Sequence, residues 1–224
     1  ANACNAVLLQ ASSNGGYVTL ATMTDPGAAL SEQFCVARTY AMAEGERLMG
    51  QVAGYTPAEI AEQCGGFSAM LAGQVTALGA GDMASVTTAM RAVADGTGLA
   101  PADLAATSRV CLGVGYTQDD IRMALGSALM LVSLGEAPYA ELMGHHLREG
   151  YGVPATPDRA MQWYDAALRA LDDGAAPVFM PGQPERASLL RAATMQLKGT
   201  ASEGLRPVPA SQEGATLPVF SIGD

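Results

Sequence analysis

At residues 50–59 the chain reads GQVAGYTPAE, a pattern that ends one helix and begins the next. Gly50 is suited to closing a helix, and Thr56 is suited to capping the following one because its hydroxyl can accept a hydrogen bond from a free backbone N–H. Pro57 fits the first helical position, and Glu59 places negative charge in the first turn, where the helix dipole favours it. Capping, backbone geometry and charge therefore agree on a helix-to-helix turn.

The turn signal recurs twice further along the chain. It reads GVGYTQDD at residues 113–120 and GYGVPATPD at residues 150–158, so that glycine again precedes a threonine and acidic residues. The recurrence predicts three helical hairpins, at about 28–78, 101–134 and 137–172.

Helical spacing of apolar residues extends the prediction to most of the chain. Further helices are expected at about 83–94 and 185–197. The segment 1–27 contains two short apolar runs around a turn-rich stretch and is expected to be irregular or a β-hairpin. The segment 200–224, rich in Gly, Pro and Ser, is expected to be a flexible tail. The sequence thus predicts an all-α domain at 28–199, with helix-turn-helix hairpins stacked as a short α-solenoid.

Composition argues against a β-sandwich, a nucleic-acid partner and a transmembrane segment. Aromatic residues make up only 5% of the chain, which favours close-packed helices over a β-sandwich. The formal net charge of −10 opposes binding to nucleic acid, because phosphates need Lys or Arg to neutralise them. The longest apolar run, at residues 124–134, is about half the length needed to cross a bilayer, so no transmembrane segment is expected.

The four cysteines are Cys4, Cys35, Cys64 and Cys111, with no CxxC spacing and no neighbouring histidine. This pattern argues against a zinc site and favours two disulfides. We expect Cys35 to pair with Cys64 across the first hairpin, and Cys4 with Cys111 by default. The chain begins Ala1-Asn2-Ala3 without methionine, as after removal of a signal peptide or at an engineered start. A periplasmic or secreted protein is favoured; the alternative is a cytoplasmic protein with four reduced, buried thiols.

Two segments carry a pattern known from a repeat family. The chain reads GHHLREGYGVP at residues 144–154 and AMQWYDAA at residues 160–167. Together these segments resemble one unit of the Sel-one-like repeat, a relative of the tetratricopeptide repeat, at about 137–172. The resemblance implies structural roles in helix approach, loop conformation and packing between hairpins for Gly144, Gly150, Gly152, Trp163 and Tyr164.

The resemblance also implies a function. Such repeats commonly act as adaptors in signalling and bacterial envelope processes, so we expect a non-catalytic scaffold that binds a protein or peptide partner. In the repeat alignment, Glu141, His145 and Arg148 fall on the exposed side of one helix. This polar stripe is interpreted as either a partner-binding surface or an ordinary solvated face.

No metal or cofactor is expected. His145 and His146 are the only histidines, and adjacent helical positions point about 100° apart, which prevents them from sharing one metal ion. A Cys–His nucleophile would require Cys111 to lie beside His145. Standard catalytic motifs are absent, which favours a protein that is not an enzyme.

Two alternative functions stay open. Paired acids at Asp119-Asp120 and Asp172-Asp173 could act as general acid and base, although their positions at helix ends explain them more simply. A lone carboxylate, Glu59 or Glu141, could serve a helical enzyme acting on cell-wall glycans; a pocketed carboxylate with a raised pKa would favour this hypothesis.

The other alternative is a helical protein that binds a small apolar ligand. Met130, Met143 and Met161 suggest such a site. Methionines at helical spacing are more often part of a hydrophobic core.

Overall fold

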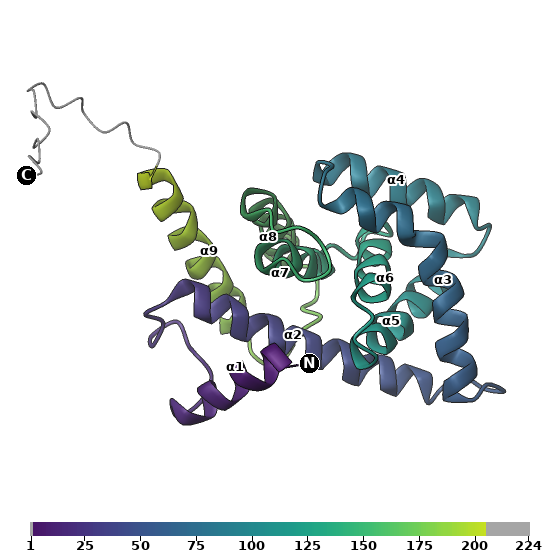
Figure 1. Ribbon diagram of the computed structural model, residues 1–224, viewed down its shortest axis with the longest axis horizontal. Coiled ribbons are helices and arrows are strands. Elements are labelled where there is room, and N and C mark those ends of the chain that lie inside the picture. The colour runs from purple at the N-terminus through teal and green to yellow at the C-terminus, as the bar shows by residue number, and fades with distance from the viewer. Residues whose placement is uncertain (1, 205–224) are drawn as a thin grey trace, which may run out of the picture.

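The computed structural model describes the backbone of residues 2–204, with side chains from 4 to 199, and contains nine α-helices and one 3-10 helix in that range (Figure 1). Their bounds are α1 Asn2–Ser13, α2 Pro26–Met49, α3 Pro57–Leu78, α4 Met83–Gly96, α5 Pro101–Thr117, α6 Ile121–Ser133, η1 Ala137–Tyr139, α7 Ala140–Glu149, α8 Pro157–Asp172 and α9 Glu185–Gly204. The described residues contain no strand, which confirms the all-α prediction. None of these helices combines the length and the hydropathy that crossing a bilayer requires.

The helices α2, α3, α4 and α6 begin at capping side chains, whereas α5 and α7 do not, and Thr156 makes no capping hydrogen bond at the start of α8. Asp25 accepts hydrogen bonds from the backbone N–H groups of Gly27 and Ala28 at the start of α2. Thr56 and Glu59 form a reciprocal capping box at the start of α3, with a proline in the first turn. The first turn signal is therefore confirmed.

The structure corrects the turn expected at residues 113–120. The helix α5 continues to Thr117, and Asp120, not Thr117, caps α6 by accepting a backbone hydrogen bond of 3.0 Å. Gly113 instead lies at a helix crossing, where a Cβ atom added to it would be 2.7 Å from the Cα of Gly45 in α2. Close packing of two helices, rather than chain reversal, accounts for this glycine.

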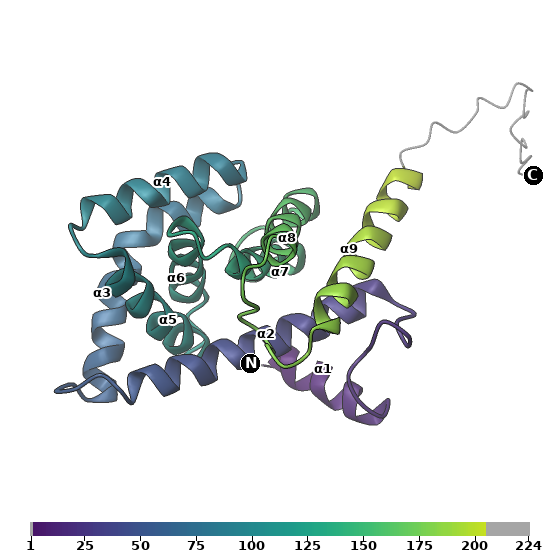
Figure 2. The same ribbon diagram turned by 180° about the vertical axis from the view of Figure 1, so that it is seen from behind.

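Two of the three expected hairpins form, and the first does not. The helix α5 packs along α6, and α7 packs along α8. The helices α2 and α3 are both present but diverge from the loop that joins them: α2 packs against α5 and α9, whereas α3 packs against α6 (Figures 1 and 2). The prediction of a packed hairpin at 28–78 is therefore wrong.

Small residues allow α3 to pack closely against α6. A Cβ atom added to Gly126 of α6 would be 3.1 Å from the Cβ of Leu71 in α3.

The helix α1 replaces the β-hairpin or irregular structure expected for residues 1–27. Cys4 of α1 is bonded to Cys35 of α2, and Val7 packs against the main core. Short isolated helices are marginal in water, so these contacts with α2 are what stabilise α1. The local sequence does not reveal that partner.

The helix α9 is longer than expected. It runs to Gly204 rather than ending near residue 197, so the first residues of the predicted tail at 200–224 are helical. The rest of that tail lies outside the described residues. Figures 1 and 2 show α9 at one end of the molecule and α3 at the other.

The main core is built from side chains of all the described α-helices. Its large buried side chains include Leu30 of α2, Leu71 of α3, Met90 of α4, Tyr116 of α5, Leu129 of α6 and Trp163 of α8. Burial of this kind is the dominant stabilising contribution in a helical protein of this size.

Candidate functional site

The polar stripe expected on the surface of α7 is buried. Glu141 is 3% exposed and His145 is fully buried, and only Arg148 is partly accessible. The helix α7 is enclosed by α2, α6 and α8, and the first turn of α9 brings Arg186 against Glu141. The interpretation of Glu141, His145 and Arg148 as an exposed binding face is therefore wrong, because α7 is buried on all sides from Ala140 to Leu147.

Glu141 is the centre of a buried polar cluster. The Arg186 guanidinium donates hydrogen bonds to both carboxylate oxygens of Glu141, at 2.9 Å from Nη1 to Oε2 and shorter from Nη2 to Oε1. His145 Nε2 lies 3.1 Å from Glu141 Oε1, and the hydroxyl of Tyr164 lies 2.7 Å from His145 Nδ1. A neutral His145 that donates from Nε2 and accepts at Nδ1 satisfies both contacts.

The electrostatics of this cluster favour a charged carboxylate beside a neutral imidazole. Burial acts to raise the pKa of Glu141, but Arg186 and His145 outweigh it and lower that pKa to about 2. Burial also lowers the pKa of His145, despite the neighbouring carboxylate. A carboxyl group with so low a pKa cannot act as a general acid near neutral pH.

His146 belongs to a second buried contact network. Its Nδ1 lies 2.8 Å from the carbonyl oxygen of Tyr151, and its Nε2 lies 2.8 Å from the hydroxyl of Tyr116. The imidazole therefore donates to the carbonyl and accepts from the phenol. Burial lowers the pKa of His146 to about 4 and raises that of Tyr116. These groups join α5 to α7 and to the loop that follows α7.

Glu59, Asp119 and Asp172, which are also candidates for catalysis in the sequence, have structural partners. Glu59 is exposed, and its hydrogen bonds from the Thr56 backbone and side chain lower its pKa. Asp119 pairs with Arg38, and Asp172 with Arg191. Neither Glu59 nor Glu141 has the raised pKa that would favour the hypothesis of an enzyme acting on glycans.

One carboxyl group does have a raised pKa. Burial raises the pKa of Glu32, and this side chain accepts a hydrogen bond of 2.6 Å from the backbone N–H of Val18. The contact ties the loop between α1 and α2 to α2, which gives Glu32 a structural role.

The disulfides differ from the expected pairing. Cys4 is bonded to Cys35, and Cys64 to Cys111. Cys35 and Cys64 cannot meet because α2 and α3 diverge, and Cys111 is unavailable to His145 as a nucleophile because it is already bonded. The described residues contain no cluster of three or more His, Cys, Asp or Glu side chains suited to a metal ion.

The residues singled out by the repeat pattern lie inside the α7–α8 hairpin. Gly144 lies under the ring of Tyr164, 2.9 Å from an added Cβ, and Trp163 is 2% exposed. Gly150 and Gly152 both have positive φ, of 74° and 76°, in the connecting loop. These glycines permit a loop conformation that other residues rarely adopt.

The methionines proposed to bind a small ligand belong mostly to the core. Met130 and Met143 are fully buried, and Met161 is a partly buried residue packed against the same core. Since Met130 and Met143 have no accessible surface for a ligand to contact, the apolar-ligand hypothesis cannot rest on these residues.

An apolar groove lies at the other end of the molecule, between α3 and α5. Its volume is about 710 Å³, within the range of ligand-binding pockets. The end of α2 and the following loop, α3, and α5 supply its walls, and we call it the α3–α5 groove. Its lining residues are Leu48, Gln51, Val52, Tyr55, Ile60, Gln63, Cys64, Gly66, Phe67, Met70, Ala106, Thr107, Val110 and Cys111.

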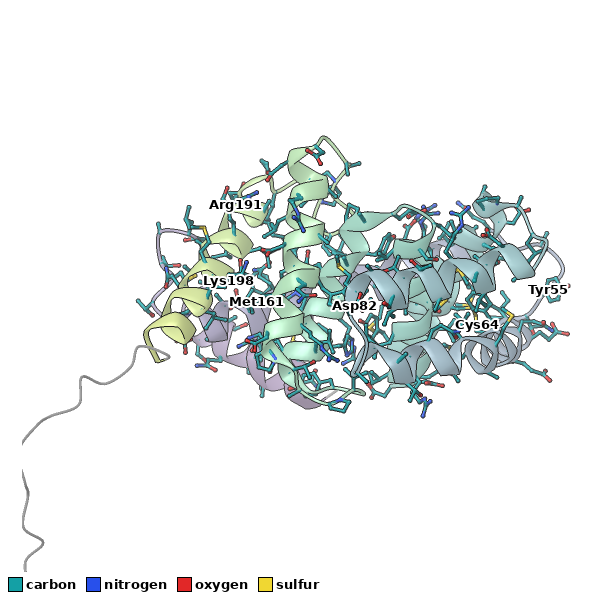
Figure 3. The ribbon with its side chains drawn as sticks, turned by 90° about the horizontal axis from the view of Figure 1, so that it is seen from above. Tyr55, Cys64, Asp82, Met161, Arg191 and Lys198 are labelled. Atoms are coloured by element: carbon teal, nitrogen blue, oxygen red, sulfur yellow. A yellow bond between two sulfur atoms is a disulfide. The ribbon has the colours of Figure 1, made fainter. Side chains whose placement is uncertain are left out.

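The groove combines a rigid floor with an exposed apolar rim. The disulfide between Cys64 and Cys111 joins its two walls, and both cysteines are buried. Tyr55 and Met70 are 57% and 46% exposed, and Val52 is also exposed. Figure 3 shows Tyr55 and Cys64 together at the end of the molecule opposite α9. None of the lining side chains is charged.

Sequence reasoning missed this groove because it placed α2 against α3 as a packed hairpin. One signal was available: the apolar surface of α3 is wider than its contact with the core. Leu71 and Val75 pack into the main core, Phe67 packs against that core and also lines the groove, and Met70 lines the groove with an exposed side chain. Apolar surface that extends past the core contact predicts an additional binding surface.

Comparisons with known proteins identify no relative: no family model, curated protein or solved structure matches the chain. The fold and the groove therefore define the chain as an all-α protein with an open apolar groove between two disulfide-linked helices.

Proposed function

We propose that this chain is a non-catalytic protein-interaction scaffold that binds its partner in the α3–α5 groove. The observation that carries the proposal is the exposure of large apolar side chains around that groove. Val52, Tyr55 and Met70 form its rim and would be covered by a partner. Contiguous apolar surface of this kind commonly marks an interaction site.

The ionisable groups of α7 support a non-catalytic function. Glu141, His145 and His146 are closed from solvent, and each has hydrogen-bond partners within the protein. A substrate would have to displace core side chains to reach them. Their contribution is to hold α5, α7, α8 and α9 together.

The cysteines support the proposed compartment. All four are in disulfides, and disulfides persist in oxidising compartments. We therefore place the scaffold in the periplasm or outside the cell. The repeat resemblance at residues 137–172 is compatible with this assignment, because such repeats commonly act as adaptors in signalling and envelope processes.

Site-specific photo-crosslinking tests this proposal. A photoreactive residue at Met70 should form a discrete crosslink in extracts of the native host, whereas one at Met195 should not. Met195 is a matched control because it is a methionine, is 64% exposed and lies on α9 at the opposite end. The crosslink should disappear with excess unlabelled protein but persist with excess Phe67→Glu variant. A crosslink pattern that is the same at both positions would contradict the proposal.

A small apolar ligand is a second candidate occupant of the same groove. The volume of about 710 Å³ would accommodate one. Native mass spectrometry of protein purified from its host tests this alternative, because a retained ligand would add a defined mass that Phe67→Glu removes.

A further inference from the structure

The α3–α5 groove has the dimensions of a helix-binding site. Its lining residues on α3 extend from Ile60 to Met70, which is about 15 Å at the rise of an α-helix. The facing wall of α5 extends from Ala106 to Cys111. About three turns of a third helix would match this length and present side chains at i, i+3, i+4 and i+7.

The groove is more open to solvent than most small-molecule sites. More than half of its lining residues are exposed, and Cys64 and Cys111 are buried at its floor. Small-molecule sites usually bury most of the ligand surface, whereas a helix laid in a groove leaves its polar face in water. The geometry therefore favours a polypeptide partner.

The border of the groove is acidic. Glu59 and Glu62 lie one helical turn before the lining residues Gln63 and Gly66, and Asp103 lies one turn before Thr107. All three carboxylates are exposed. Between Pro57 and Leu78, the helix α3 contains no Lys or Arg.

Nearby basic residues do not neutralise this border. Arg47, at the end of α2, pairs with Glu44, and Arg109, on α5, pairs with Glu136. The groove therefore presents an uncharged apolar floor between unneutralised carboxylates. A partner with Lys or Arg beside its apolar face would have the complementary charge.

A second copy of this chain is a poor occupant. A symmetric dimer through the groove would bring the same surface together on both subunits. The carboxylates of Glu59, Glu62 and Asp103 would then face one another, which opposes association.

We infer that the α3–α5 groove binds an amphipathic helix whose apolar face is bordered by Lys or Arg residues. This inference rests on the proposed function and specifies the chemistry of the partner. The disulfide keeps the walls in place before binding, and the acidic border orients the incoming helix and accelerates encounter.

Two synthetic peptides test the inference. Both are about 18 residues, or five helical turns, with the same Leu and Phe face. One has Lys at its polar positions and the other has Glu. Fluorescence anisotropy of the labelled peptides should show binding of the Lys peptide that weakens with added salt, and at least tenfold weaker binding of the Glu peptide.

Protein variants locate the binding. Phe67→Glu should abolish binding of the Lys peptide, and Met70→Glu, at an exposed residue of the rim, should do the same, whereas Met195→Glu should leave it unchanged. The triple variant Glu59→Gln, Glu62→Gln and Asp103→Asn should weaken it by about tenfold at low salt. Glutamine at position 59 can still form the capping box with Thr56, so α3 keeps its N-terminal cap. Circular dichroism of each variant verifies that the fold is intact.

The outcomes separate the inference from the proposed function. If both peptides bind equally well and Phe67→Glu abolishes the binding of both, the inferred positive charge of the partner is wrong, but the groove is still a peptide-binding site. If neither peptide binds but a neutral apolar dye binds in a Phe67-dependent manner, the inference fails and the small-ligand candidate stands. If neither peptide and no dye binds, both the inference and the groove-based function are wrong.

Discussion

Arg186 forms a bidentate ion pair with Glu141, which is 45 residues earlier in the chain, and both side chains are closed from solvent. The pair joins the first turn of α9 to the first turn of α7. His145 adds a third group to the same carboxylate. Buried charges are tolerated only when they are paired in this way.

Removing one partner should therefore be costly. We expect Arg186→Ala to lower the free energy of unfolding by about 3–5 kcal/mol, because Glu141 is left charged and unpaired in the interior. Arg191→Ala is the control: its ion pair with Asp172 is exposed, and its loss should cost about 1 kcal/mol or less. Urea unfolding of both variants measures the difference. Equal effects would show that Glu141 and Arg186 are solvated in solution.

The buried histidines make stability depend on pH. The pKa of His146 is about 4 in the folded protein, below the value of 6.5 for an unperturbed histidine, so the unfolded chain binds its proton first as the pH falls. Stability should decrease by roughly 3 kcal/mol between pH 6.5 and pH 4 from this group. Glu141 adds a further loss of stability as the pH falls from 4.5 toward 2. The folded protein stabilises the ionised form of Glu141, so the unfolded chain takes up this proton first.

Unfolding measured across this pH range checks the prediction. His146→Gln retains a donor and an acceptor but does not titrate, so its stability should change less between pH 6.5 and pH 4. A protein that becomes more stable below pH 6.5 would mean that the folded state protonates its histidines more readily than the unfolded chain does.

Glycines with positive φ differ in what surrounds them. An added Cβ on Gly152 would overlap the side chain of Ile121, whereas nothing lies within 4 Å of one added to Gly174. Gly174→Ala should therefore cost only backbone strain, about 1–2 kcal/mol. Gly152→Ala should cost about 1–3 kcal/mol more from overpacking. Thermal denaturation of the two variants gives the comparison, and equal losses would show that Ile121 moves aside freely.

Sequence alone could predict what local chemistry determines. Thr56 and Glu59 are three residues apart, so their capping box can be recognised in the sequence, and so can the helix that follows it. The pairing of helices is not local. Gly45 and Gly113 let α2 pack closely against α5 instead of against α3. The expected disulfide between Cys35 and Cys64 therefore does not form, and the surface between α3 and α5 stays open as the groove.

The same limit applies to the polar stripe on α7. Periodicity places Glu141 and His145 on one face, but only the position of Arg186 on α9 shows that this face is buried. A polar pattern on a helix is consistent with either solvent or a buried partner, and the partner here comes from a distant part of the chain.

The last prediction concerns the two disulfides, which should contribute similarly to stability but differently to binding. Cys4 and Cys35 are separated by 31 residues, and Cys64 and Cys111 by 47. Loop-closure entropy gives each bond about 4 kcal/mol of stability by restricting the unfolded chain. Replacing either pair with alanines should therefore lower the unfolding free energy by a similar amount.

Only the bond between Cys64 and Cys111 joins the walls of the α3–α5 groove. Cys64→Ala with Cys111→Ala should weaken binding of the Lys peptide by at least about fivefold, because the walls are no longer held in the binding geometry. Cys4→Ala with Cys35→Ala should leave that affinity unchanged in protein that remains folded. Anisotropy titrations below the unfolding transition of both variants measure the contrast. If the two variants bind equally well, non-covalent packing of α3 and α5 against each other and against α6 is enough to hold the groove open.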